Sequence, residues 1–240
     1  MKKQKLFSYI LTAVFCYTIN AQTTDSTTVE KKFNVNTGID ILNNYIWRGV
    51  PLDKGPNLQP SVILNYDKLK LSFLGSYSLK YEFNNIMTVL SYDIDTKIGT
   101  ISPTLSHYYY PYDGVKLSDY RRHDGSFSHI TELGFQYLGD KIPLRIYTSM
   151  NIVNDVENST YFEAGYSLKV NQMTFEPFVG GVFNKSPDWQ AATSAGLLNI
   201  GFNIYKEVKV ASGNNLPLTG TLSYHTQLDL LSVMVRLSVF

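Results

Sequence analysis

Apolar and polar residues alternate along most of the chain. From Phe33 to Arg48 the odd positions are mostly apolar and the even positions mostly polar, and Leu69–Tyr81 repeats the pattern more cleanly. A period of two is typical of a β-strand with one apolar face. These stretches exceed the about 5–6 residues of an ordinary soluble strand and match the roughly 9–11 that cross a bilayer at a tilt. The pattern therefore predicts membrane-spanning strands.

Ten further segments between turn residues show the same alternation. They are Leu58–Tyr66, Ile86–Asp95, Gly99–Tyr110, Phe127–Leu138, Leu144–Ile152, Thr160–Val170, Met173–Phe183, Leu197–Tyr205, Leu216–His225 and Leu230–Phe240. Twelve strands leave about 17 residues for each strand and its connection, which suits a membrane barrel. The sequence predicts an all-β protein, an antiparallel up-and-down transmembrane β-barrel of about twelve strands.

The connections between these strands alternate in length. Tight turns follow Tyr66, Asp95, Gly139 and Val170, and longer connections fall at 49–57, 111–125, 154–158 and 184–196. Outer-membrane barrels have short periplasmic turns and longer extracellular loops. The segment Lys206–Asn215 departs from this rule, because it is long where a short turn is expected.

The first residues resemble a targeting segment. Three lysines precede an apolar stretch over Leu6–Ile19, so we expect residues 1–21 to be a signal peptide that is cleaved before Gln22. A lipoprotein anchored through Cys16 is disfavoured because bulky Phe15 precedes it. Residues 22–32 are expected to form a periplasmic tail and residues 33–240 the barrel, in the outer membrane of a Gram-negative bacterium.

Composition narrows the function classes. The chain is 44% hydrophobic and 17% charged, with 21 Lys+Arg against 20 Asp+Glu and one cysteine. This excludes a disordered chain, a disulfide framework and a general nucleic-acid binder. Signal cleavage removes three lysines, so the balance becomes 18 minus 20, or −2.

Aromatic residues gather near the predicted strand ends, where a membrane interface favours them. Candidate interface residues are Tyr45, Trp47, Tyr77 and Tyr81. The chain ends at Phe240, and a terminal Phe resembles the signal that the barrel-assembly machinery recognises. We expect outer-membrane lipid and that machinery as partners, and a monomer. A soluble ligand-binding barrel is the alternative, and recovery without detergent would favour it.

Ionisable residues on the polar faces would line the lumen. Glu132, Arg145, Glu163 and Glu176 lie near the middles of consecutive strands, so antiparallel pairing should gather them into one belt. The belt is either a structural ion-pair network or a constriction that favours cations. Further lumen candidates are Arg48, Asp40 and Arg236, and the last two would form a salt bridge where the first and last strands meet.

The longest connection, 111–125, contains Tyr120, Arg121, Arg122 and His123. It either folds over or into the barrel mouth or lies outside as a solvated surface loop. No catalytic motif is found around the four histidines, and the sequence shows no spacing typical of a metal site. We therefore predict no enzymatic activity and no cofactor.

A short motif resembles a known family. The run Asn44–Gly49 with Pro51, followed by Gln59-Pro60-Ser61, is similar to the first hairpin of the TorF-type porins. The later run from Lys206–Lys209 to Leu216–Gly220 resembles related outer-membrane proteins. The resemblance implies a Gram-negative outer-membrane barrel with an inferred transport role, and it brings no catalytic residues.

Twelve strands are more than side chains alone fill and fewer than the 16 to 18 of an open channel. We therefore expect a narrow channel for small hydrophilic solutes. The alternatives are a non-conducting structural or surface-interaction barrel and, less favoured, a lipid-modifying enzyme.

Overall fold

The computed structural model describes residues 33–111, 115–123, 126–210, 213 and 215–239. The chain divides into two units, Met1–Lys31 and Lys32–Phe240. The predicted signal peptide, the predicted tail and Phe240 lie outside the described residues. Within the described part, no helix has both the length and the apolar character to cross a membrane.

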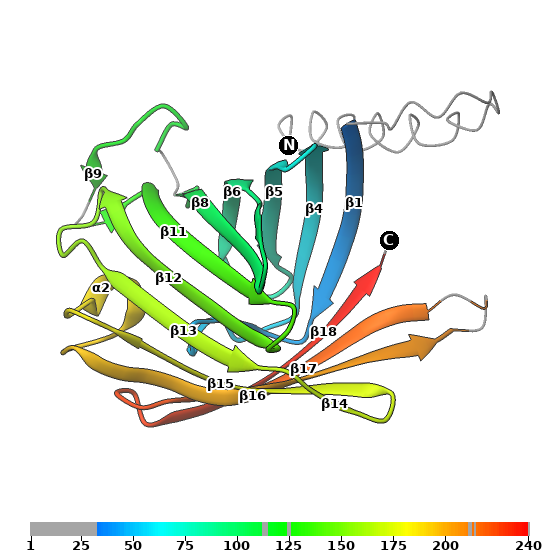
Figure 1. Ribbon diagram of the computed structural model, residues 1–240. Helices are drawn as coiled ribbons and strands as arrows, with labels where there is room; N and C mark the ends of the chain where they lie inside the picture. The colour runs from blue at the N-terminus through cyan, green and yellow to red at the C-terminus, as the bar shows by residue number, and fades with distance from the viewer. Residues whose placement is uncertain (1–32, 112–114, 124–125, 211–212, 214, 240) are drawn as a thin grey trace. The chain divides into compact units, whose positions relative to one another are not determined.

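The second unit is a closed antiparallel barrel (Figure 1). Its main sheet has fourteen strands, and two pairs of these are interrupted halves of one barrel strand, which leaves twelve. They are β1 (Phe33–Leu42), β4 (Asn57–Tyr66), β5 (Leu69–Ser78), β6 (Asn84–Tyr92) with β7 (Ile94–Thr96), β8 (Gly99–Tyr109), β11 (His129–Gly139), β12 (Leu144–Val153), β13 (Thr160–Tyr166) with β14 (Leu168–Val170), β15 (Met173–Val182), β16 (Gly196–Lys209), β17 (Asn215–His225) and β18 (Leu230–Val239). The predicted all-β up-and-down barrel is confirmed.

The connections hold four short strands and one short helix. They are β2 (Tyr45–Trp47), β3 (Val50–Asp53), β9 (Arg122–His123), β10 (Ser126–Phe127) and α2 (Pro187–Gln190). The two hairpins β2–β3 and β9–β10 form small sheets of their own.

The two faces of the barrel differ in polarity. On β18, Leu231, Val233 and Val235 are exposed on the outer face, whereas Ser232 and Met234 are buried inside. The buried residues of the whole unit are mostly polar, and large exposed apolar residues occur on every barrel strand. This arrangement inverts that of a soluble globule and fits a β-barrel membrane protein.

The first and last strands close the barrel through a short ladder. Four residue pairs join β1 to β18, from Ile39 opposite Val239 to Leu42 opposite Arg236, whereas ten pairs join β1 to β4. Arg236 Nη1 lies 3.8 Å from Asp40 Oδ2 inside this junction. The predicted pairing of Asp40 with Arg236 is confirmed.

Two predicted boundaries are wrong. The first strand does not run to Arg48, because β1 ends at Leu42 and the alternation over 45–48 belongs to the separate β2–β3 hairpin. Arg48 and Gly49 adopt left-handed backbone conformations, with φ of 51° and 81°, which form the tight turn between β2 and β3. The connection predicted over Lys206–Asn215 is shorter than expected, since β16 continues to Lys209, which pairs with Asn215 at the start of β17.

Candidate functional site: the barrel lumen

Two networks of charged side chains occupy the lumen at different heights. β12 begins after a short turn, and Arg145 is its second residue. β11 begins after the longest connection, and Glu132 is its fourth residue. The two residues therefore lie toward opposite ends of the barrel. We call the first set the wall network, consisting of Arg145, Glu163, Glu176 and the groups that bond to them. We call the second the hairpin network, consisting of Arg48, Glu132 and the groups that bond to them.

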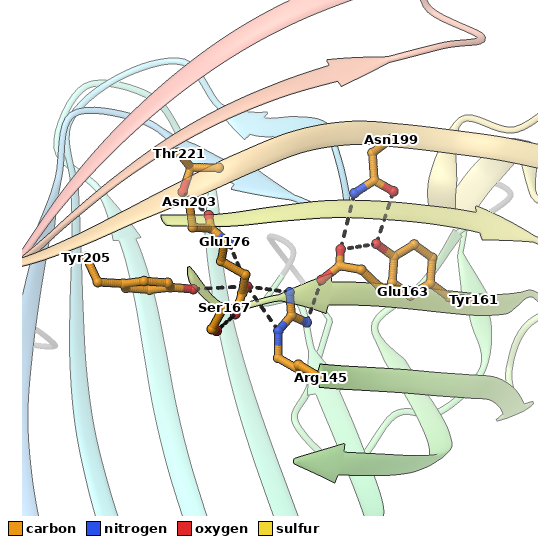
Figure 2. A network of polar contacts seen from close by, with 9 residues as sticks. All are labelled: Arg145, Tyr161, Glu163, Ser167, Glu176, Asn199, Asn203, Tyr205 and Thr221. Atoms are coloured by element: carbon orange, nitrogen blue, oxygen red, sulfur yellow. Dashed lines mark hydrogen bonds and ion pairs between the residues drawn. The ribbon is translucent and has the colours of Figure 1, made fainter. Parts of the chain in front are cut away.

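The wall network joins three neighbouring barrel strands, as Figure 2 shows. Arg145 Nη1 donates to Glu163 Oε1 at 2.7 Å, and Nη2 donates to Glu176 Oε1 at 2.9 Å. The three side chains come from β12, β13 and β15. One guanidinium therefore bridges two carboxylates across consecutive strands, and three of the four residues of the predicted belt do come together.

The remaining acceptor sites of the two carboxylates are also filled. Glu176 accepts hydrogen bonds from Asn203, Tyr205 and Ser167, and Glu163 accepts from Tyr161 and Asn199. Every carboxylate oxygen has at least one donor, which is the condition for keeping two carboxylates beside one guanidinium in a half-buried site. This geometry favours the structural ion-pair network over a cation-binding constriction.

Glu132 belongs to a different network, so the predicted single belt is wrong. Its carboxylate is fully buried and accepts from Arg48 Nη2 at 2.7 Å. Ser149 donates to the same oxygen as Arg48, Oε2, at 2.9 Å. Tyr147 and Tyr108 donate to the other oxygen, Oε1, at 2.7 and 3.1 Å. The partner that sequence spacing missed is Arg48, which is 84 residues away and reaches Glu132 only because the hairpin folds inward.

Arg48 is enclosed by aromatic rings. Its guanidinium carbon lies 4.2 Å from the ring centre of Trp47 and 4.4 Å from that of Tyr161, distances typical of cation–π contacts. Burial alone would lower the pKa of Arg48, but the charge of Glu132 and the nearby tyrosines outweigh it and hold the pKa above its usual value. Arg48 is therefore positively charged at physiological pH.

The β2–β3 hairpin crosses the lumen. It connects β1 to β4, yet Trp47 contacts Tyr108 on β8 and Arg48 bonds to β11 and β12. A Cβ atom at Gly49 would lie 2.7 Å from Asn199 Cβ on β16, so the backbone approaches the far wall more closely than other residues allow. The hairpin therefore fills part of the lumen on the side of the long connections.

A second segment meets the hairpin inside the barrel. Trp189 on α2 lies 5.0 Å from Trp47, centre to centre, and 5.2 Å from Tyr108. Tyr45 packs against the buried cluster of Leu42, Ile46 and Met234. The prediction that Tyr45 and Trp47 lie at a membrane interface is therefore wrong, because both rings pack against residues of the hairpin or of the inner barrel wall.

The other predicted aromatic residues lie elsewhere. Tyr77 is near the end of β5, on the outward-facing register of Leu69 and Phe73, and Tyr81 is exposed in the following connection. These positions are compatible with the predicted interface role of Tyr77 and Tyr81.

The predicted mouth loop packs against the outer side of the barrel. The ring of Tyr120 stacks on His129 with centres 4.0 Å apart, and Arg121 bonds to Asp119. Alternation along β11 directs His129 outward, since Glu132 and Gly134 face the lumen. This favours the surface-loop alternative for Tyr120 and Arg121. Arg122 and His123 form β9, which pairs with β10.

The described part of the chain holds no group of three or more His, Cys, Asp or Glu residues that could bind a metal ion. In His225, Nε2 contacts the carbonyl of Gln190 and Nδ1 accepts from the Leu228 amide. Both ring nitrogens therefore have backbone partners.

The class that fold and lumen define is a closed twelve-stranded β-barrel with a polar, internally ion-paired lumen. No model of a known protein family matches the chain, and no curated protein matches it. The resemblance to the TorF-type porins therefore stays a prediction that rests on the quoted motifs.

Proposed function

We propose that the protein is a porin-like barrel of a Gram-negative outer membrane that passes small hydrophilic solutes through a narrow path. The observation that carries this proposal is the polarity of the two faces. The inward charges are paired with one another, as in Arg145 with Glu163 and Glu176, while the outward face is apolar. A polar lumen inside an apolar surface is the arrangement of a membrane barrel.

The number of strands and the inward hairpin limit the size of the solute. Twelve strands lie below the 16 to 18 that leave an open aqueous channel, and the β2–β3 hairpin narrows the lumen further. The proposal includes outer-membrane lipid and the barrel-assembly machinery as partners, a monomeric state, and membership of the TorF-type porins. It includes no enzymatic activity.

A charged residue on the outer face tests the membrane environment. Leu105, at the middle of β8, is 43% exposed, and we expect Leu105→Arg to cost about 2–4 kcal/mol of unfolding free energy in lipid. Leu117→Arg, in the exposed connection, is the control and should change little. Urea unfolding in lipid vesicles measures both variants. Equal, small effects would indicate a soluble barrel instead.

Conductance in planar bilayers tests the channel. The folded protein should conduct, and neutralising lumen charges with Arg145→Gln or Glu163→Gln should change the conductance or the ion selectivity. Lys68→Gln, at the exposed Lys68–Asp95 pair of a short turn, is the matched control. A purified, folded protein that never conducts would contradict the proposal.

One observation favours a second candidate, a non-conducting barrel that serves as a structural or surface-interaction protein. The hairpin and Trp189 fill lumen space on the side of the long connections. In that case the native protein would not conduct in planar bilayers.

A further inference from the structure

The way in which the β2–β3 hairpin is attached differs from that of every barrel strand. The backbone ladder of β2 and β3 joins them only to each other. Side chains make the contacts with the far wall, above all Arg48 with Glu132 and Ser149. A unit with its own ladder and a side-chain attachment can move without breaking the barrel.

The surface under the tip of the hairpin carries several polar groups beside the aromatic ring of Tyr161. Arg48 and Gly49 lie against Glu132, Ser149, Asn199 and Ser223. If the tip moves out of the lumen, these polar groups become hydrated. Opening breaks the apolar contacts of Trp47, the contact of Arg48 with the ring of Tyr161 and, at the base, the contacts of Ile46. The hydrophobic cost of opening is therefore limited to a few side chains.

The closed state contains buried polar atoms that have no hydrogen-bond partner among the described residues. They include Asn44 Oδ1 and Arg48 Nη1 on the hairpin side, and Ser223 Oγ and Trp189 Nε1 on the surfaces that the hairpin covers. Buried polar atoms without partners destabilise the state that buries them, and hydration removes that penalty. Opening would let water reach these atoms.

The root of the hairpin is anchored. The Asn43 side chain accepts from the Val235 amide at 2.6 Å, and Asp53 accepts from the Gly55 amide and from Asn57. Asp53 is the last residue of β3 and pairs with Tyr45 in the ladder. These bonds therefore hold the base of the hairpin, and the part that is free to swing is the tip beyond it.

We propose that the β2–β3 hairpin is a gate that swings out of the lumen, and that the Arg48–Glu132 ion pair is the latch that holds it closed. This inference rests on the proposed channel function, whose regulation it specifies. The attachment is localised at this pair, because Arg48 bonds from the hairpin to Glu132 on the far wall. Glu132 accepts four hydrogen bonds, from Arg48, Tyr108, Tyr147 and Ser149.

Thiol accessibility tests the movement independently of conductance. Ser223 is 1% exposed, and its Oγ lies 3.5 Å from where a Cβ at Gly49 would stand. A Ser223→Cys variant, with Cys16→Ser as background, should react slowly with a small charged methanethiosulfonate reagent. Adding Glu132→Gln should raise the rate by about a hundredfold, because it removes one partner of a buried ion pair. An unchanged rate would overturn the latch.

The matched control lies on the same strand. Thr221 is two residues from Ser223 on the same inward face of β17, where it bonds to Asn203 next to the wall network. The reaction rate of Thr221→Cys should not respond to Glu132→Gln. If both introduced thiols respond equally, the barrel has loosened as a whole and the gate is overturned.

A variant without the gate does not depend on Glu132. Leu42 and Asn57 are directly paired, so replacing residues 44–56 with one glycine joins β1 and β4 through an Asn-Gly turn, which suits a two-residue hairpin. This variant should conduct several-fold more than the native protein in planar bilayers. Equal, non-zero conductance of the two would overturn the gate. Failure of both to conduct, while the thiol of the Ser223→Cys variant still responds to Glu132→Gln, would remove the channel function and leave the moving hairpin.

Discussion

The two lumen networks use the same chemistry for different attachments. In the wall network, Arg145 and Glu163 lie on β12 and β13, which a backbone ladder already holds together. In the hairpin network, Arg48 and Glu132 connect segments that share no ladder. In the wall network the guanidinium–carboxylate pair therefore adds to the backbone ladder between two strands. In the hairpin network it supplies much of the attachment of the hairpin to the barrel wall. Four predictions test this difference.

The largest effect is expected for Glu132→Ala. The substitution leaves Arg48 charged and buried without its carboxylate, and removes the acceptor of Tyr108 and Tyr147, so we expect a loss of about 3–5 kcal/mol of unfolding free energy. Urea unfolding in detergent or lipid measures it. Arg48→Ala combined with Glu132→Ala should cost clearly less than the sum of the two single changes, and additive losses would show that the pair is not coupled.

Arg145→Ala should be the next largest. It leaves two carboxylates facing each other, but the Arg145 side chain is 22% exposed and water partly replaces it, so we expect about 3 kcal/mol or less. Arg145→Lys is the informative control, because an ammonium cannot present the planar fork that reaches both Glu163 and Glu176. Since neighbouring barrel strands hold these residues, adding Arg145→Ala to the Ser223→Cys variant should leave the thiol reactivity unchanged. An increase there would remove the distinction between the two networks.

Tyr161→Phe should have a smaller effect, about 1–2 kcal/mol from the loss of one buried hydrogen bond to a charged acceptor. Tyr161 is the residue that touches both networks, because its hydroxyl donates to Glu163 while its ring lies under Arg48. The variant keeps the ring, so the contact with Arg48 should survive. Unfolding free energy and the thiol reactivity of Ser223→Cys separate the two roles: stability should fall and reactivity should stay the same.

The wall network was largely predictable from sequence and the hairpin network was not. Strand alternation is a local signal, and with antiparallel pairing it places Arg145, Glu163 and Glu176 on one inward face of neighbouring strands. The hairpin was not predicted because Tyr45 and Trp47 continue the apolar odd positions of β1. A strand that ends at Leu42 and is followed by a hairpin therefore shows the same alternation as one longer strand. Asn43-Asn44 and Arg48-Gly49 were the local signals of a turn. The position of Arg48 depends on contacts with Glu132 and Ser149, which are 84 or more residues away in the sequence. No local pattern contains that information.

The smallest effect concerns the junction between the first and last strands. Arg236 and Asp40 are 3.8 Å apart, and their side chains are 36% and 25% exposed. A partly solvated pair at this distance contributes little, so a double-mutant cycle with Asp40→Ala and Arg236→Ala should give a coupling energy of about 0.5 kcal/mol. A coupling of about 2 kcal/mol or more would contradict this expectation. It would also mean that the junction resembles the hairpin network, with side chains compensating for a ladder of four residue pairs where β1 and β4 share ten.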